Sequence, residues 1–340
     1  MVTPPQLIRR HFEDVLTHLT GAFDGDPESV HQARIATRRL REVLAVVDSA
    51  HVAHATDAVR AAGRQLGRVR ELDVTDGLLL SMSDRIPYSA ATELHALRRA
   101  VLQRQRDARR RMVKKVELLD LPAIGEAIDV FTDGSQSSPW KWLPRISGRA
   151  ASNWSEPIWT RIVTRSQEAA AAAERTPAIY FPNRVHKARI AIKKLRYAVE
   201  IAAETGIWRP GRILRDLRKL QGILGDIHDL QVLGNFAAQP LPGDGATPTD
   251  RSAINDFVDS EIIRHYAEYS SRRRWIGPLT AACAHAAAHR RWRIAPPLLA
   301  ASIFTAPLVL EAITPARRNG TTATHRRDAS DTMPLHETGT

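Results

Sequence analysis

The stretch that decides the fold is VHQARIATRRLR at residues 30–41, because a close copy, VHKARIAIKKLR, stands at residues 185–196. The two segments are identical at eight of twelve positions, and three of the four differences pair polar or basic residues. A second pair follows in the same order, LGRVRELDV at 66–74 and LGDIHDLQV at 224–232. Self-similarity of this kind predicts that the chain is a duplicated unit of roughly 130–155 residues.

Both copies have the periodicity of an amphipathic helix. Apolar or small residues recur at intervals of three and four, which places them on one helix face. In the first copy this face comprises Val30, Ala33, Thr37, Leu40, Leu44 and Val47, and in the second Val185, Ala188, Ile192, Leu195 and Val199. Asp26 followed by Pro27 is typical of a helix start, with Asp26 as the N-cap and Pro27 as the first helical residue. We expect each copy to be a helix that turns this face toward a core.

The remainder of the chain also favours helix. Helical patterns cover residues 6–20, 92–119, 158–175 and 252–275, and no segment shows the sustained alternation of a strand. We therefore predict an all-α protein in which two pseudo-symmetric helical bundles, of about four helices each, arise from the internal duplication.

The composition changes along the chain suggest domain boundaries. We predict a first bundle at 1–135, a linker rich in Ser, Gly and Pro at 136–157, a second bundle at 158–290, and a tail at 291–340. Residues 294–313 are apolar and long enough to cross a bilayer, but they contain three prolines, so we do not expect a membrane-spanning helix there. The polar end of the tail is expected to be disordered.

The charge balance indicates the kind of partner. The chain carries 49 Lys and Arg against 37 Asp and Glu, a net charge of +12, which favours a polyanionic partner. The single cysteine, Cys283, excludes an internal disulfide framework and a zinc site built from cysteines. The N-terminal residues contain no apolar segment typical of a secretory signal, so we expect a cytoplasmic protein.

A second stripe of side chains runs beside the apolar face of each repeated helix. It consists of His31, Arg34, Arg38 and Arg41 in the first copy and of His186, Arg189, Lys193 and Arg196 in the second. Like charges four residues apart destabilise a helix by about 0.2–0.5 kcal/mol per pair, and no acidic residue stands within either stripe. A bound polyanion would offset this repulsion, since Arg and Lys both bind phosphate oxygens.

Other interpretations of these residues stay open at this point. A single basic run on a helix is commonly a solvated surface, and further runs occur at 98–115, 209–219 and 272–274. Duplication also preserves structural positions, so His31 and His186 are either ligand-facing or structural histidines.

With both copies of the motif, the chain resembles the CHAD family, the conserved histidine α-helical domain. The resemblance rests on two copies of H-x-x-R-x-x-x-[RK]-[RK]-L-R and on the segment from Leu217 to Gln231, and it covers roughly residues 5–290. It implies two pseudo-symmetric helical bundles with basic residues around a central groove or pore. It further implies inorganic polyphosphate as the ligand and polyphosphate granules as a setting.

The resemblance also implies which side chains bind. In the first half these are His31, Arg34, Arg38, Arg41 and Arg70, and in the second half His186, Arg189, Lys193, Lys194, Arg196, Arg218 and Lys219. The chain departs from the family pattern at Arg70-Glu71-Leu72-Asp73 and at His228-Asp229, and the second departure leaves the role of His228 open.

The sequence is compatible with three functions. The favoured one is binding of polyphosphate without catalysis, cofactor or metal, because it needs only the cationic stripes. Single-stranded nucleic acid is the alternative partner, but its binding proteins place aromatic residues among the cations, and the stripes contain none. The least favoured function is a metal-dependent phosphohydrolase, for which His228-Asp229 would be a fragment of the site; further ligands at suitable spacing are not evident.

Overall fold

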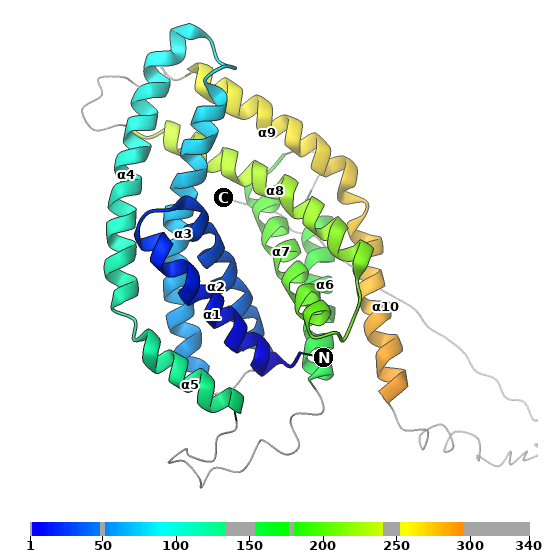
Figure 1. The fold of residues 1–340 in the computed structure, drawn as a ribbon. Helices are drawn as coiled ribbons and strands as arrows, with labels where there is room; N and C mark the ends of the chain where they lie inside the picture. Colours follow the sequence, from blue (N-terminus) through cyan, green and yellow to red (C-terminus); the bar gives the residue numbers. More distant parts are fainter. Residues whose placement is uncertain (1, 48–51, 134–153, 177–179, 241–251, 295–340) are drawn as a thin grey trace, which may run out of the picture. The chain divides into compact units, whose positions relative to one another are not determined.

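The computed structural model describes residues 2–47, 52–133, 154–176, 180–240 and 252–294. Residues 136–153 of the predicted linker and the predicted tail from residue 295 onward lie outside these ranges. Ten α-helices and one short 3-10 turn make up the regular structure of these residues (Figure 1). The first five are α1 (Pro4–Phe23), α2 (Pro27–Val47), α3 (Ala53–Met82), α4 (Ala91–Glu117) and α5 (Leu121–Asp133). The other five are α6 (Ser155–Glu174), α7 (Pro182–Glu204), α8 (Gly211–Ala237), α9 (Ser252–Arg273) and α10 (Ile276–Ile294). The all-α prediction is confirmed for the described residues.

Local sequence accounts for where several helices begin. Thr3 caps α1: its hydroxyl accepts a hydrogen bond from the backbone N–H of Gln6, while the Gln6 side chain accepts one from the backbone N–H of Thr3. Pro182 is the first residue of α7, where the missing N–H costs nothing. The Asp120 carboxylate accepts a hydrogen bond from the N–H of Ala123 at the start of α5.

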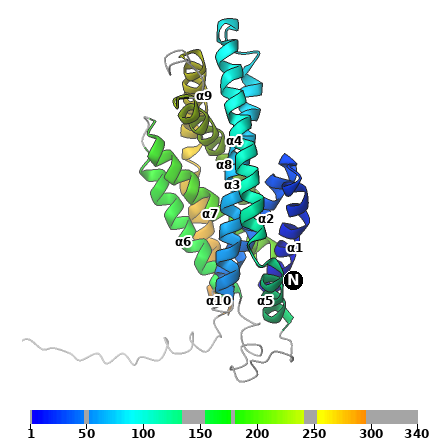
Figure 2. The same ribbon diagram turned by 90° about the vertical axis from the view of Figure 1, so that its left-hand side faces the viewer.

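The two halves of the chain pack their helices in the same order. Helix α1 packs on α2, α2 on α3, α3 on α4, and α1 on α5; likewise α6 packs on α7, α7 on α8, α8 on α9, and α6 on α10. Figure 2 shows α3 and α4 side by side along their length. This common order supports the duplication, which remains an inference from the sequence. Among the described residues each half contains five helices where about four were expected; the additional helices are α5, of 13 residues, and α10, of 19 residues.

The halves meet through the middle helices. Helix α2 contacts α7 and α6, and α3 contacts α8. Ion pairs cross the boundary: Arg161 lies 2.5 Å from Glu42, and Arg10 lies 2.6 Å from Glu204. The buried apolar side chains of both halves belong to one cluster. The boundary between the halves therefore holds α2 and α7, the two helices that carry the basic stripes, next to each other.

The structure adds detail to the predicted boundaries. Helix α6 begins at Ser155, so the last residues assigned to the linker are helical. Both halves belong to one compact unit, Met1–Ile294. Among the described residues, no helix combines the length and apolar character that crossing a bilayer requires.

Candidate polyanion-binding site

The apolar stripe of each repeated helix fixes how the basic stripe points. Val30, Ala33, Thr37, Leu40 and Leu44 of α2 are buried, as are all five counterparts predicted on α7. Helix α2 begins at Pro27, and the carboxylate of Asp26 accepts hydrogen bonds from the backbone N–H and the hydroxyl of Ser29 at 2.8 and 2.5 Å. The predicted start of this helix and the core face of α7 are confirmed, and the core face of α2 is confirmed except at Val47, which is only partly buried and packs against the core. The adjacent basic stripes consequently lie at the edge of the core.

The contact between α2 and α7 brings four cations from the two halves together. Arg34 and Arg38 come from α2, and Arg189 and Lys193 come from α7. The positive charges of Arg38, Arg189 and Arg34 all lower the pKa of Lys193, and that of Arg189 lowers the pKa of Arg34. We call Arg34, Arg38, Arg189 and Lys193 the central cation cluster. All four side chains are half-buried.

Burial and mutual repulsion make this cluster costly to charge. Desolvation, followed by the neighbouring arginines, lowers the pKa of Lys193 to about 7. The same causes, in the same order, lower the pKa of Arg34 to about 10. Desolvation also lowers the pKa of Arg189. Each of these groups would gain a more favourable charged form from an anion placed among them.

Three histidines lie at the edge of the cluster. His31 is half-buried, and its pKa is lowered by desolvation and then by the charge of Arg70. The ring centroids of His186 and His228 are 5.3 Å apart. Desolvation and the charge of Arg189 lower the pKa of His228 to about 4. The Nδ1 atom of His31 is buried and has no hydrogen-bond partner among the described residues. His228, whose role the sequence left open, therefore lies beside His186 at the edge of the central cation cluster.

Two carboxylates partly balance the cations. Desolvation lowers the pKa of Arg189 and of Arg34, and the negative charge of Asp229 on α8 acts against this lowering, more weakly at Arg34. Glu71 on α3 also raises the pKa of Arg189. Burial raises the pKa of Asp229 itself, and the arginines act against that rise. Two carboxylates facing four cations and Arg70 leave a net positive charge at the contact between the halves.

The remaining predicted residues do not all join this cluster. Arg41 is exposed and lies near enough to lower the pKa of Lys193. Arg196 instead donates hydrogen bonds to Gln221 and to Glu200, at 2.5 and 2.6 Å, and its guanidinium lies 4.2 Å from the Tyr197 ring centroid. Arg196 is thus engaged in a contact between α7 and α8.

Arg218 shares the partner of Arg196. Its guanidinium lies 3.1 Å from the carboxylate of Glu200. Lys219 is exposed on α8, and Lys194 is half-buried on α7; no interaction places either of them in the central cation cluster. These two lysines and Arg218 remain predictions from the resemblance.

Acidic residues also belong to the surroundings of the cluster. The sequence identified Glu71 and Asp229 as departures from the family pattern, but not that both act on Arg189. A second missed network lies on the other side of α3, where Asp73 accepts hydrogen bonds from Gln105 and Arg109 at 2.5 and 3.1 Å. The signal was present in the position of Glu71 and Asp229, which align in the repeated segments 66–74 and 224–232.

Among the residues that the structure describes, no group of three or more His, Cys, Asp and Glu side chains is placed to hold a metal ion. The imidazole of His228 faces cations.

Comparisons with known proteins give the family. No curated protein sequence matches the chain. Among solved structures, the CHAD domain from the plant Ricinus communis is similar, with 23% identity, a TM-score of 0.57, and coverage of 82% of this chain and 90% of that one. PptA from Streptomyces chartreusis is similar with 14% identity and a TM-score of 0.56, covering 80% of this chain and 98% of that one. The family model of the CHAD domain matches residues 6–238. The chain therefore belongs to the CHAD domain family.

Proposed function

We propose that the protein binds inorganic polyphosphate, without catalysis, through the central cation cluster. The observation that carries the proposal is the convergence of cations from α2 and α7, whose charges lower one another's pKa. Such an arrangement raises the free energy of the unliganded protein. A chain of phosphates supplies anionic oxygens at short intervals and would convert this repulsion into charge-assisted hydrogen bonds. The proposed setting is the cytoplasm, at polyphosphate granules.

The surroundings of the cluster favour a polyanion without bases. Proteins that bind single strands stack bases on exposed aromatic rings. Here Tyr197, which interacts with Arg34 and Arg189, is only 5% exposed and is covered by Arg196. Trp159 is also buried, with its ring centroid 5.4 Å from that of Trp208. Nucleic acid therefore remains the second candidate, favoured only by the net charge.

The surroundings also favour binding over hydrolysis. Arg189, His186 and Lys193 all lower the pKa of His228, so an incoming divalent cation would be repelled at this position. A phosphate-release assay with Mg²⁺ or Mn²⁺ tests this part of the proposal. We expect no turnover; turnover that disappears in His228→Ala would support the phosphohydrolase instead.

The direct test is competition at several salt concentrations. Polyphosphate and mixed-sequence single-stranded DNA of equal total charge are competed for the full-length protein. We expect polyphosphate to displace the DNA and its affinity to fall linearly with salt on logarithmic axes, because binding releases counterions. Displacement of polyphosphate by the DNA would reject the proposal.

A further inference from the structure

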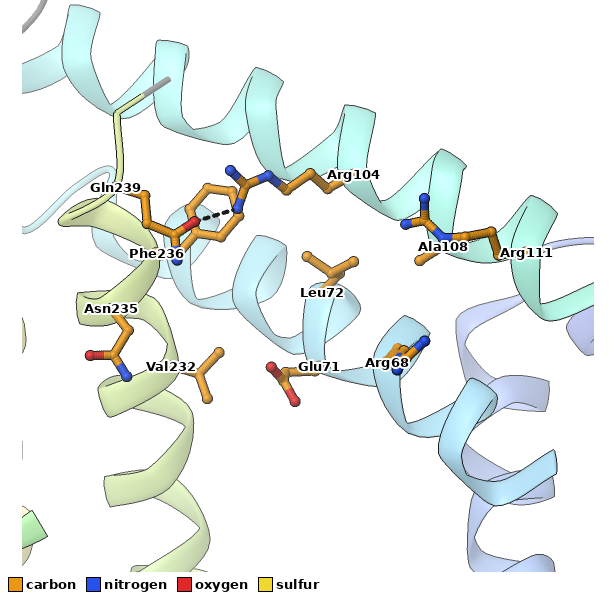
Figure 3. Close-up of a pocket in the computed structure, with 10 residues that line it drawn as sticks. All are labelled: Arg68, Glu71, Leu72, Arg104, Ala108, Arg111, Val232, Asn235, Phe236 and Gln239. Carbon is orange, nitrogen blue, oxygen red and sulfur yellow. Dashed lines mark hydrogen bonds between the residues drawn. The ribbon is translucent and has the colours of Figure 1, made fainter. Parts of the chain in front are cut away.

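A hollow is lined by residues of α3, α4 and α8 and by Gln239, which follows α8. Its volume is about 470 Å³, which is within the range of roughly 300–1,000 Å³ common for small-molecule sites. Figure 3 shows its lining, with Arg104 and Arg111 on α4, Arg68 and Glu71 on α3, and Phe236 on α8. The predicted site residues do not line it.

The charges around the hollow favour an anion. Three arginines line it, and Glu71 is the single carboxylate among the lining residues. Arg68 and Arg111 are exposed, and neither has an ion-pair partner among the described residues. Arginine binds phosphate through two parallel hydrogen bonds, so this side of the hollow suits a phosphate group.

The opposite side of the hollow carries apolar side chains and one more arginine. Leu72, Val232 and Phe236 contribute carbon surface, although Phe236 is only 7% exposed. The guanidinium of Arg104 lies 4.4 Å from the centroid of the Phe236 ring and donates a hydrogen bond to Gln239 Oε1 at 2.8 Å. These two contacts hold the planar guanidinium in place, so that its own face, and not the buried ring, is the surface on which a flat heteroaromatic group can stack.

Amide groups stand at the rim of this platform. Asn235 and Gln239 line the hollow from one end of α8 and the residues that follow it. Amide side chains both donate and accept hydrogen bonds, as the polar edge of a nucleobase requires. Inorganic polyphosphate has no use for either the apolar surface or the amides.

The hollow and the central cation cluster are adjacent but chemically distinct. Glu71 lines the hollow and also raises the pKa of Arg189, so one carboxylate separates the two groups of arginines. Arg68 lines the hollow, whereas Arg70, two residues along α3, acts on His31 and Asp229. Ligands of different kinds can therefore be bound on the two sides of α3.

We propose that the hollow binds a nucleotide, with its phosphates on Arg68 and Arg111 and its base stacked on the Arg104–Phe236 pair. This inference goes beyond polyphosphate binding and does not depend on it. The class of ligand follows from three features that occur together: arginines at one side, the guanidinium of Arg104 held over Phe236 at the other, and amides beside it.

The test uses titration calorimetry of the full-length protein with ADP and, separately, with pyrophosphate, which carries the phosphates without the base. We expect ADP to bind one per chain and more tightly than pyrophosphate. Arg104→Gln and Arg111→Gln should each weaken ADP binding about tenfold or more, because the first removes the cation on which the base stacks and the second removes a charge-assisted contact to the phosphates. The matched control is Arg106→Gln, on an exposed part of α4 that does not line the hollow, and it should leave ADP binding unchanged.

A second variant tests the apolar side. Val232→Trp places a large side chain in the hollow and should abolish ADP binding. Polyphosphate binding, measured on the same variants, should persist. Arg34→Glu should instead lose polyphosphate binding and keep ADP binding. Equal affinities for ADP and pyrophosphate, or loss of ADP binding in Arg34→Glu with no effect of Arg104→Gln, would overturn the proposal. Failure to bind ADP while polyphosphate still binds would reject this inference alone.

Discussion

Arg38 on α2 and Lys193 on α7 occupy the same position of the repeated helix, and so do Arg70 on α3 and His228 on α8. The first half thus has arginines at these two positions, whereas the second half has a lysine and a histidine. Burial and the surrounding arginines lower the pKa of Lys193 to about 7 and that of His228 to about 4. The two halves share a motif but therefore differ in the fraction of their basic side chains that is positively charged before an anion binds.

The comparison extends to the last arginine of the stripe. Arg41 is exposed and acts on Lys193, whereas its counterpart Arg196 is bonded to Glu200 and Gln221. The same repeated position is thus an exposed cation near the cluster in one half and an ion-paired cation between two helices in the other. The following predictions test that difference, beginning with the residues that the two halves share.

The largest effect is expected from charge reversal in the central cation cluster. Arg34→Glu and Arg189→Glu should each weaken polyphosphate binding at least about 100-fold, because each removes a charge-assisted hydrogen bond and adds repulsion. The helical circular dichroism should survive, since both arginines are half-buried among like charges. Binding is measured by titration calorimetry.

The matched control for charge reversal is Arg99→Glu, on an exposed part of α4. It changes the net charge equally and should weaken binding only slightly. Loss of the helical signal in the Arg34 or Arg189 variants would show that these residues support the fold. A loss in Arg99→Glu as large as theirs would show that only net charge matters.

A smaller effect should separate the two halves. Arg41→Gln should weaken polyphosphate binding severalfold and leave thermal stability unchanged, because Arg41 is exposed. Arg196→Gln should lower the free energy of unfolding by about 1–3 kcal/mol, since it leaves the buried carboxylate of Glu200 with one partner fewer. Chemical denaturation and calorimetry on the same two variants measure both effects. The reverse pattern would mean that Arg196 faces the ligand.

The smallest effect concerns protons. A bound phosphate favours the charged ammonium, so it raises the pKa of Lys193 from about 7, and binding takes up a proton above that pH. Affinity should therefore fall as the pH rises above about 7, by at most about tenfold per pH unit from this one group.

Lys193→Arg keeps the positive charge of the side chain, as Arg38 does in the first half. This variant should lose most of the proton uptake near pH 8, measured by calorimetry in buffers of different ionisation enthalpy. His31 and His186, whose pKa values lie below the ordinary value, contribute below that range. Uptake that is equal in wild type and variant would assign the proton to another group.

The fold was predictable because its signals are local. The apolar faces of α2 and α7 follow from periodicity, and the start of α2 follows from Asp26 and Pro27. Helices α5 and α10, of 13 and 19 residues, were missed, although Asp120 and Pro122 are typical of a helix start. Helices in proteins are stabilised mainly by packing, which periodicity alone does not reveal.

The site was predictable only in part. The stripe on each helix identified Arg34, Arg38, Arg189 and Lys193, since residues three or four apart share a face. The engagement of Arg196 by Glu200, and the positions of Asp229 and Glu71, depend on how α7, α8 and α3 pack. Such contacts between helices join residues far apart in the chain, and no spacing rule gives them.

The central claim is that the two halves form one polyphosphate site where α2 meets α7. Its most direct test is the stoichiometry of a short chain, tripolyphosphate, titrated into the full-length protein at low salt, for wild type and for Arg34→Glu and Arg189→Glu. We expect one chain per protein, with binding lost in either variant. Two chains per protein, of which each variant loses only one, would contradict the claim and show that the halves bind separately.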